Sequence, residues 1–195
     1  MILSARRLGA LALAVAVPTA FAAHVGFSVA AEPFPAVQAE KLFILTNYCE
    51  GVVFDHAGNG YASYAKYIEK FSVDGRHDVW AETGAPNGHK ILADGTHLVC
   101  DASQHGVLKL DANGKQIGFA AKECDGKPLR GPNDLSLDTA NGGFYFTDPG
   151  GSDLKNPIGT VHYVDAQGVT HLVADGLAFP NGIALRPDGK TLLVG

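Results

Sequence analysis

Four short segments of the chain place an oxygen-bearing side chain directly before a short run of alternating apolar residues. They begin at Glu50, Asn87, Asn133 and Asn181, at spacings of 37, 46 and 48 residues. A repeat of about 20–50 residues is typical of solenoids and propellers. If each repeat is one blade, equivalent positions face a common axis and the four polar groups converge in space. Hard divalent cations such as calcium take carboxylate and amide oxygens as ligands.

Strands joined by tight turns must position these groups. Asp-Gly and Asn-Gly pairs, which supply the positive φ of tight hairpins, separate apolar runs from Glu50 onward. Residues 88–93, 96–101, 106–111 and 115–121 predict four antiparallel strands, and residues 134–138, 143–147, 159–165 and 169–174 predict four more. Four strands in about 40–50 residues form a propeller blade. A β-sandwich is the alternative, since its hairpins have similar spacing, but the recurring Asn-Gly or Asn-Asp favours an all-β propeller.

The repeats also indicate how much of a ring is present. Three repeats are complete, and a fourth runs to the apolar segment 191–194. Propellers close into rings of about 4–8 blades, because an open ring leaves bare edges. We therefore expect about three and a half blades here, as part of a longer protein.

The first residues read as a targeting segment. Arg6 and Arg7 precede the apolar run 8–17, which is shorter than the roughly 20 residues of a membrane-spanning helix. We expect a signal peptide over 1–31, a partial propeller over 32–195, and no membrane span after cleavage. The protein would then be exported, either periplasmic or secreted.

Several chemistries lack their sequence signatures. The formal charge is −5 and no basic stripe is present, so we expect no nucleic-acid partner. The eight histidines form no zinc-binding spacing, the three cysteines include no CxxC pair, and no GxSxG occurs. The oxygen-bearing side chains at the four segment starts are therefore the most informative candidates for a functional site.

Four motifs in this order carry a family resemblance: Glu50–Asp55, Gly131–Asp134, Phe144–Pro149 and Phe179–Ala184. Together they resemble the gluconolactonase family, which includes senescence marker protein and luciferin-regenerating enzyme. The resemblance implies a six-bladed β-propeller in the full protein, with one divalent cation, usually calcium, in its axial channel. It also implies that Glu50, Asn133 and Asn181 are metal ligands, and that a fourth ligand, an Asp, lies beyond residue 195.

The resemblance implies a metal-dependent hydrolase that opens a sugar lactone or a similar cyclic ester, with a lactone-like small molecule as substrate. Asp148 matches a position that some members use as an acid or base, and its alternative is a strand-end Asp before Pro149. Asn87 and Arg130 are candidate substrate-binding residues, whose alternatives are a plain turn and a solvated loop arginine. A non-catalytic propeller that binds a ligand or a protein is the alternative function, because fold alone does not settle activity.

Overall fold

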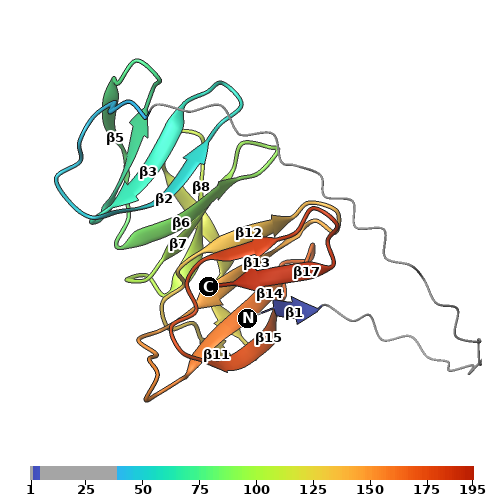
Figure 1. Cartoon of the computed structure of the whole chain (residues 1–195). Helices are drawn as coiled ribbons and strands as arrows, with labels where there is room; N and C mark the ends of the chain where they lie inside the picture. Colours follow the sequence, from blue (N-terminus) through green and yellow to red (C-terminus); the bar gives the residue numbers. More distant parts are fainter. Residues whose placement is uncertain (1, 5–38) are drawn as a thin grey trace, which may run out of the picture. The chain divides into compact units, whose positions relative to one another are not determined.

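The structure, a computed structural model, describes residues 2–4 and 39–195. Within these ranges every regular element is a strand, which confirms the all-β prediction (Figure 1). No helix among the described residues has the length and apolar character needed to cross a membrane. Apart from residues 2–4, the predicted signal peptide lies outside the described residues. Residues 42–195 belong to one compact unit together with the strand Ile2–Ser4.

Three four-stranded antiparallel sheets follow one another along the chain, each with its strands in sequential order. The first sheet contains β2 (Cys49–Phe54), β3 (Gly60–Tyr64), β4 (Tyr67–Phe71) and β5 (His77–Glu82). The second contains β6 (Pro86–Ile91), β7 (His97–Asp101), β8 (Gly106–Leu110) and β9 (Gln116–Ala121). The third contains β12 (Leu135–Asp138), β13 (Gly143–Asp148), β14 (Gly159–Val164) and β15 (Thr170–Leu177). The eight strands predicted after Asn87 and Asn133 are therefore confirmed, with end points shifted by at most three residues.

A fourth sheet and a small hairpin complete the described elements. The fourth sheet has the order β1 (Ile2–Ser4), β17 (Thr191–Val194), β16 (Ile183–Leu185), and all of its pairings are antiparallel. The hairpin of β10 (Glu123–Cys124) and β11 (Lys127–Pro128) lies in the connection from the second sheet to the third.

Aspartate-capped turns join the third and fourth strands of the second and third sheets. In the β8–β9 turn, Oδ1 of Asp111 accepts two backbone N–H bonds, at 2.9 and 3.0 Å, and Gly114 has φ +81°. In the β14–β15 turn, Oδ1 of Asp165 accepts the equivalent bonds at 3.0 and 2.9 Å, and Gly168 has φ +82°. Residues with a side chain rarely adopt this φ. Gly at the fourth position therefore fixes the conformation of each turn and, with it, the register of the two strands.

Apolar side chains fill the spaces between neighbouring sheets. The first and second sheets enclose Tyr61, Ile68, Ala81, Val99, Leu108 and Leu110. The second and third enclose a larger cluster that includes Leu98, Val107, Leu135, Phe144, Phe146 and Val164. A smaller cluster of Val161, Ile183 and Leu192 joins the third and fourth.

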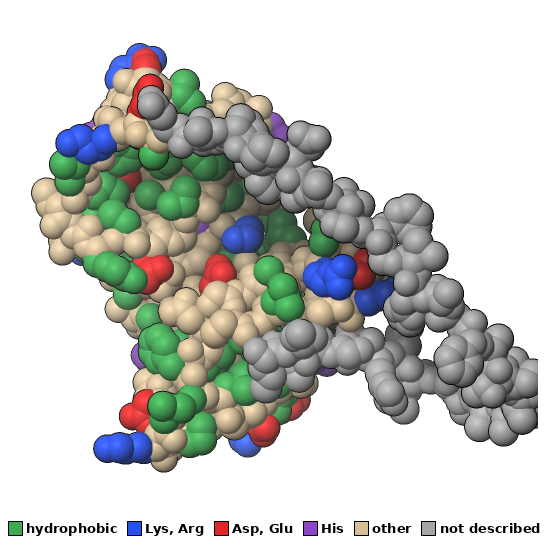
Figure 2. All heavy atoms as spheres, viewed as in Figure 1, with side chains coloured by type: hydrophobic (Ala, Val, Ile, Leu, Met, Phe, Trp, Pro, Cys, Tyr) green, Lys and Arg blue, Asp and Glu red, His purple; other side chains and the backbone are tan. Residues whose placement is uncertain are grey.

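The first sheet buries one face and exposes the other. Val53 of β2 packs against the cluster between the first two sheets, whereas its neighbours Val52 and Phe54 are 58% and 59% exposed. Successive strand residues point to opposite faces, so both exposed side chains lie on the face away from the second sheet. Figure 2 shows hydrophobic side chains gathered on a hollowed part of this region of the surface.

Candidate metal and active site

The first strands of the second, third and fourth sheets begin beside one another, held by hydrogen bonds near their starts. The N–H of Gly88 donates to the carbonyl of Asn133 at 2.7 Å, and the N–H of Asn133 donates to the carbonyl of Thr147 at 2.9 Å. The hydroxyl of Thr147 donates to the carbonyl of Asn181 at 2.7 Å. The structure therefore brings Asn133 and Asn181 together, as the repeat predicts.

A hydroxyl recurs at one place in the second strand of two sheets. Ser63 and Thr147 are the next-to-last residues of β3 and β13. Ser63 donates to the carbonyl of Asn87 at 2.8 Å, as Thr147 does to the carbonyl of Asn181. Cys100 occupies this position in β7 and, among the described residues, donates no such bond. At that boundary the N–H of Gly88 donates to the carbonyl of Asn133 instead. Each side chain or backbone donor thus fixes the start of the next sheet.

Close backbone approach explains a glycine at the start of the first sheet. Gly51 has φ +39°, and a Cβ built on it would lie 1.7 Å from the carbonyl oxygen of Asn87. No side chain fits that space. The segment beginning at Glu50 is thereby brought against the segment beginning at Asn87, and both residues line one pocket of about 320 Å³.

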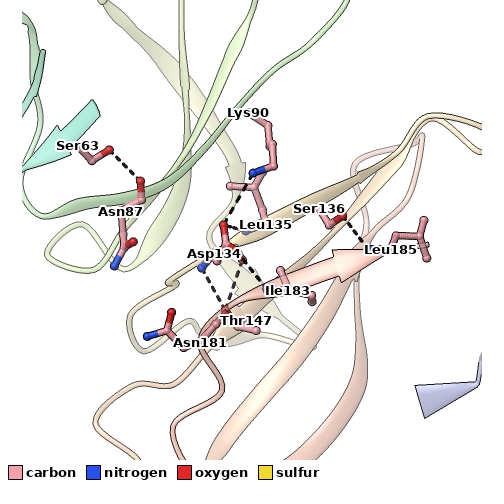
Figure 3. A network of polar contacts seen from close by, with 10 residues as sticks. All are labelled: Ser63, Asn87, Lys90, Asp134, Leu135, Ser136, Thr147, Asn181, Ile183 and Leu185. Carbon is pink, nitrogen blue, oxygen red and sulfur yellow. Dashed lines mark hydrogen bonds and ion pairs between the residues drawn. The ribbon is translucent and has the colours of Figure 1, made fainter. Parts of the chain in front are cut away.

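The carboxylate of Asp134 links three first strands (Figure 3). Its Oδ1 accepts the N–H of Leu135 at 2.8 Å and lies 4.0 Å from Nζ of Lys90 in β6. Its Oδ2 accepts the N–H of Ile183 in β16 at 3.1 Å. Charged hydrogen bonds of this kind contribute more than neutral ones, so Asp134 fixes the residue that precedes it, Asn133.

The predicted metal ligands offer oxygens with few protein partners. Oδ1 of Asn133 is buried and has no hydrogen-bond partner among the described residues. Buried amide oxygens are normally satisfied, so an unpaired one fits an absent ligand or cation. The side-chain amides of Asn87 and Asn181 point toward a common region in Figure 3. A hydrogen bond to Glu50 raises the pKa of Tyr48, which identifies Tyr48 as a partner of that carboxylate.

The donor set matches a hard cation better than a transition metal. Among the described residues, no group of three or more His, Cys, Asp or Glu side chains lies close enough to hold a metal ion. A site here would instead use one carboxylate, from Glu50, and the amide oxygens of Asn133 and Asn181. Calcium accepts such a mixture, and zinc sites rarely use it.

Asp148 holds a loop by both carboxylate oxygens. They accept the N–H of Arg130 at 3.2 and 2.9 Å, and Oδ1 accepts the N–H of Gly131 at 2.6 Å. Asp101, the last residue of β7, makes the equivalent contacts to the N–H of Ala85 at 3.1 and 3.0 Å. The repetition indicates that the segment before each first strand is fixed in this way. A catalytic role for Asp148 stays a prediction.

Arg130 lies beside Asp148 in a second pocket, of about 310 Å³. Its guanidinium donates to the carbonyl of Ile158. His162 also lines this pocket, and its Nε2 lies 2.8 Å from Oγ1 of Thr160. Burial lowers the pKa of His162, so its imidazole is neutral near pH 7. The predicted residues thus divide between the row of strand starts and a pocket beside the third sheet.

Sequence reasoning missed the residues that hold this arrangement together. Tyr48, Ser63, Asp134 and Thr147 carry no motif of their own. The repeat does contain a signal for two of them, because Ser63 and Thr147 stand at equivalent positions in their sheets. The contact from Asp134 to Ile183 joins residues 49 positions apart, and pairwise spacing does not predict it.

A solved structure has the same fold. It is that of XC5397 from Xanthomonas campestris, titled a gluconolactonase, and it superposes with a TM-score of 0.70 at 26% identity, covering 79% of this chain and 56% of that one. The sheets and this neighbour define the class as an all-β protein with the propeller-like fold of the gluconolactonases. Residues 62–195 match the SMP-30/Gluconolactonase/LRE-like region. The chain belongs to this family, which confirms the resemblance.

Two curated relatives show the extent of the match. The chain is 34% identical over 116 residues to the gluconolactonase of Zymomonas mobilis, a match that covers 55% of this chain and 32% of that protein. It is 31% identical over 178 residues to the lactonase drp35 of Staphylococcus haemolyticus, which covers 86% of this chain and 52% of that protein. The chain therefore spans about half the length of one relative and about a third of the other.

Proposed function

We propose that the protein is a metal-dependent hydrolase that opens a sugar lactone or a similar cyclic ester. Membership of the family and the names of the two relatives support lactone hydrolysis as the reaction class. The observation that supports a metal ion is Oδ1 of Asn133, which is buried and has no hydrogen-bond partner among the described residues. The substrate would be a small polar molecule with an ester carbonyl.

Glu50, Asn133 and Asn181 would hold the divalent cation, which we propose to be calcium. Two of the three donors are neutral, so the ion would keep most of its charge. When bound, such an ion polarises a carbonyl and stabilises the oxyanion that develops on it. Asp134 and the hydroxyl of Thr147 orient the two asparagines through the backbone bonds described above.

Asp148 has two possible roles, and its contacts support positioning. Two backbone N–H groups, of Arg130 and Gly131, make three hydrogen bonds to its oxygens. These bonds fix residues 130 and 131, which precede Asn133 in the chain. An acid or base must instead reach a proton on the substrate or on water, at hydrogen-bond distance. Arg130 and Asn87 are proposed to contact substrate, Arg130 from the pocket beside Asp148 and Asn87 from the pocket that it shares with Glu50.

Lactone hydrolysis by the product of the complete gene tests the proposal. Activity should be lost on EDTA treatment, return with calcium, and be absent from a folded Asn133→Ala variant. Activity that is indifferent to the chelator would exclude the metal mechanism. A folded, calcium-binding protein without lactonase activity would favour the alternative, a propeller that binds a ligand or a protein. The occupied carboxylate of Asp148 is the observation that favours this alternative.

Export is proposed from the sequence of the first 31 residues. Amino-terminal sequencing of the mature protein from the medium or the periplasm tests it. A new terminus near Ala23 or Ala31 is expected, and a retained Met1 would contradict it.

A further inference from the structure

Two neighbouring interfaces between sheets differ at equivalent residues. In each four-stranded sheet the third and fourth strands pair with a bulge. Between β4 and β5 the register passes from Ile68↔Ala81 to Glu69↔Val79, so Trp80 is the extra residue. Between β8 and β9 it passes from Val107↔Ala121 to Leu108↔Phe119, so Ala120 is the extra residue. Trp80 and Ala120 therefore occupy the same place in successive sheets.

Trp80 fills the interface between the first and second sheets. Its ring centroid lies 4.9 Å from that of Tyr61 and 4.5 Å from that of His97. Its Nε1 donates to the carbonyl of Ala112 in the β8–β9 turn at 3.3 Å. An indole at the bulge thus spans the gap between the sheets as far as the turn.

The interface between the second and third sheets has small side chains at the equivalent positions. Ala120 stands in place of Trp80, and Leu98, three residues before the end of its strand, stands in place of Tyr61. A pocket of about 640 Å³ lies there. Its apolar lining includes Leu92, Leu98, Ala120, Leu137, Phe144 and Val164. This volume is in the range of small-molecule sites, roughly 300–1,000 Å³.

The pocket is at the opposite ends of the strands from the proposed metal site. Its lining comes from the turn residues 92–93, 139–143 and 165–168, whereas Asn87 and Asn133 are at the starts of their sheets. A ligand here would therefore bind independently of the lactonase site, and its binding does not depend on the proposed function.

Two basic side chains lie at the rim. Lys109 and His56 both line the pocket. Lys109 also interacts electrostatically with Asp94. The carboxylate at the rim, Asp165, is already engaged: its Oδ2 lies 2.7 Å from Nε2 of His171, and its Oδ1 accepts two backbone N–H bonds. Lys109 is thus the cationic rim group that can meet an anionic head group, while the interior favours an apolar tail.

We propose that this pocket binds a medium-chain carboxylate, with its alkyl tail against the partly exposed Leu92, Ala120 and Leu137 and its head group near Lys109 and His56. The tail would take the space that the Trp80 ring fills in the neighbouring interface. Burial of apolar surface supplies the affinity, and Lys109 sets the preference for an anion.

Titration calorimetry with hexanoate, octanoate and decanoate tests the apolar part. Each added methylene should tighten binding by about fourfold, which follows from about 0.8 kcal/mol per buried methylene. An affinity that does not change with chain length would overturn the proposal. Nonyltrimethylammonium has the same nine-carbon tail and the opposite charge, so it should bind more weakly than decanoate. The Lys109→Glu variant should weaken decanoate binding by roughly fivefold, as expected for reversal of an exposed charge.

Two variants locate the site. Ala120→Trp should abolish decanoate binding, because the indole would fill the pocket as Trp80 fills its own interface. Ala166→Trp, in the β14–β15 turn that lines the pocket, should also weaken binding. The matched control is Ala112→Trp, in the equivalent Asp-Ala-x-Gly turn of the second sheet, which does not line the pocket and should leave binding unchanged. Equal effects of Ala166→Trp and Ala112→Trp would refute the location, even if Ala120→Trp fails to fold.

Discussion

The backbone N–H of Gly88 donates to the carbonyl of Asn133 at 2.7 Å, across the boundary between the second and third sheets. This bond replaces the hydroxyl contact that Ser63 and Thr147 make at the other boundaries. It places the start of one repeat directly against the start of the next. The proposed ligand Asn133 is therefore held by its backbone, and its side-chain oxygen has no hydrogen-bond partner among the described residues.

Gly88→Ala should destabilise the protein. A Cβ at Gly88 would lie 2.5 Å from Oδ1 of Asp134 and 2.6 Å from its Cα, so the strands must separate. Overpacking of this kind costs about 1–3 kcal/mol. Urea unfolding measures the loss. Gly182→Ala is the matched control, because a Cβ built on Gly182 would meet nothing within 4 Å and little change is expected. Equal losses for the two variants would contradict the close approach.

Thr147→Val should cost about 1–2 kcal/mol, because it leaves the partly buried carbonyl of Asn181 without its hydroxyl donor. Thr147→Ser keeps the donor and should retain most of the stability. Chemical denaturation of both variants separates the hydrogen bond from the loss of a methyl group. A Ser variant as unstable as the Val variant would show that packing, not the hydroxyl, fixes the fourth sheet.

Asp148→Asn and Asp101→Asn should lose similar stability, about 1–3 kcal/mol, since both carboxylates accept charge-assisted bonds from backbone N–H groups. A positioning role predicts that folded Asp148→Asn keeps substantial lactonase activity and an unaltered pH profile in the product of the complete gene. Loss of activity without loss of stability would instead establish Asp148 as the acid or base. Asp101→Asn is the control for the loop-holding contact alone.

The strands could be predicted from the sequence, and the contacts between sheets could not. The Asn-Gly pairs at Gly114 and Gly142 mark turns between neighbouring strands, so local patterns sufficed for the second and third sheets. The alignment of Asn87, Asn133 and Asn181 also followed from the repeat. The partners of Asp134 did not, because its bonds join strands that are distant in sequence and depend on how neighbouring sheets pack.

A buried histidine pair shows the same limit. Nε2 of His89 lies 2.8 Å from Nδ1 of His97, and the two residues are 0% and 3% exposed. No histidine spacing in the sequence marked the pair, since the two residues belong to adjacent strands and meet only in the packed interface with Trp80 and Tyr61. Because both histidines are buried, we expect the stability of the protein to depend on pH in the acid range.

The free energy of unfolding should decrease as pH falls from about 6.5 to about 4. Burial lowers the pKa of His89 to about 3 and of His97 to about 4, both below their ordinary 6.5. The unfolded chain therefore binds more protons in this window, and the stability present above pH 6.5 is lost toward the folded pKa values. Aspartates with lowered pKa values, such as Asp55 and Asp165, lose their contribution at lower pH.

The double variant His89→Leu/His97→Phe tests this assignment. Leu135 and Phe144 hold the equivalent places in the third sheet, so the substitutions copy an interface that already packs. Denaturation curves between pH 4 and 7 should show a shallower pH dependence, with up to two fewer protons taken up on unfolding. His162, whose pKa burial also lowers, accounts for a remaining slope. An unchanged slope would exclude the pair as its source.

Glu50, Asn133 and Asn181 are proposed to form one calcium site, and a calcium binding isotherm measures whether they do. Calorimetric titration of the product of the complete gene should show one site, lost in Asn133→Ala and retained in Asn113→Ala, an exposed turn asparagine. Loss of binding in the first variant alone, with both variants folded, is the predicted result. Equal calcium affinity of the wild-type protein and Asn133→Ala would exclude Asn133 as a ligand of the ion.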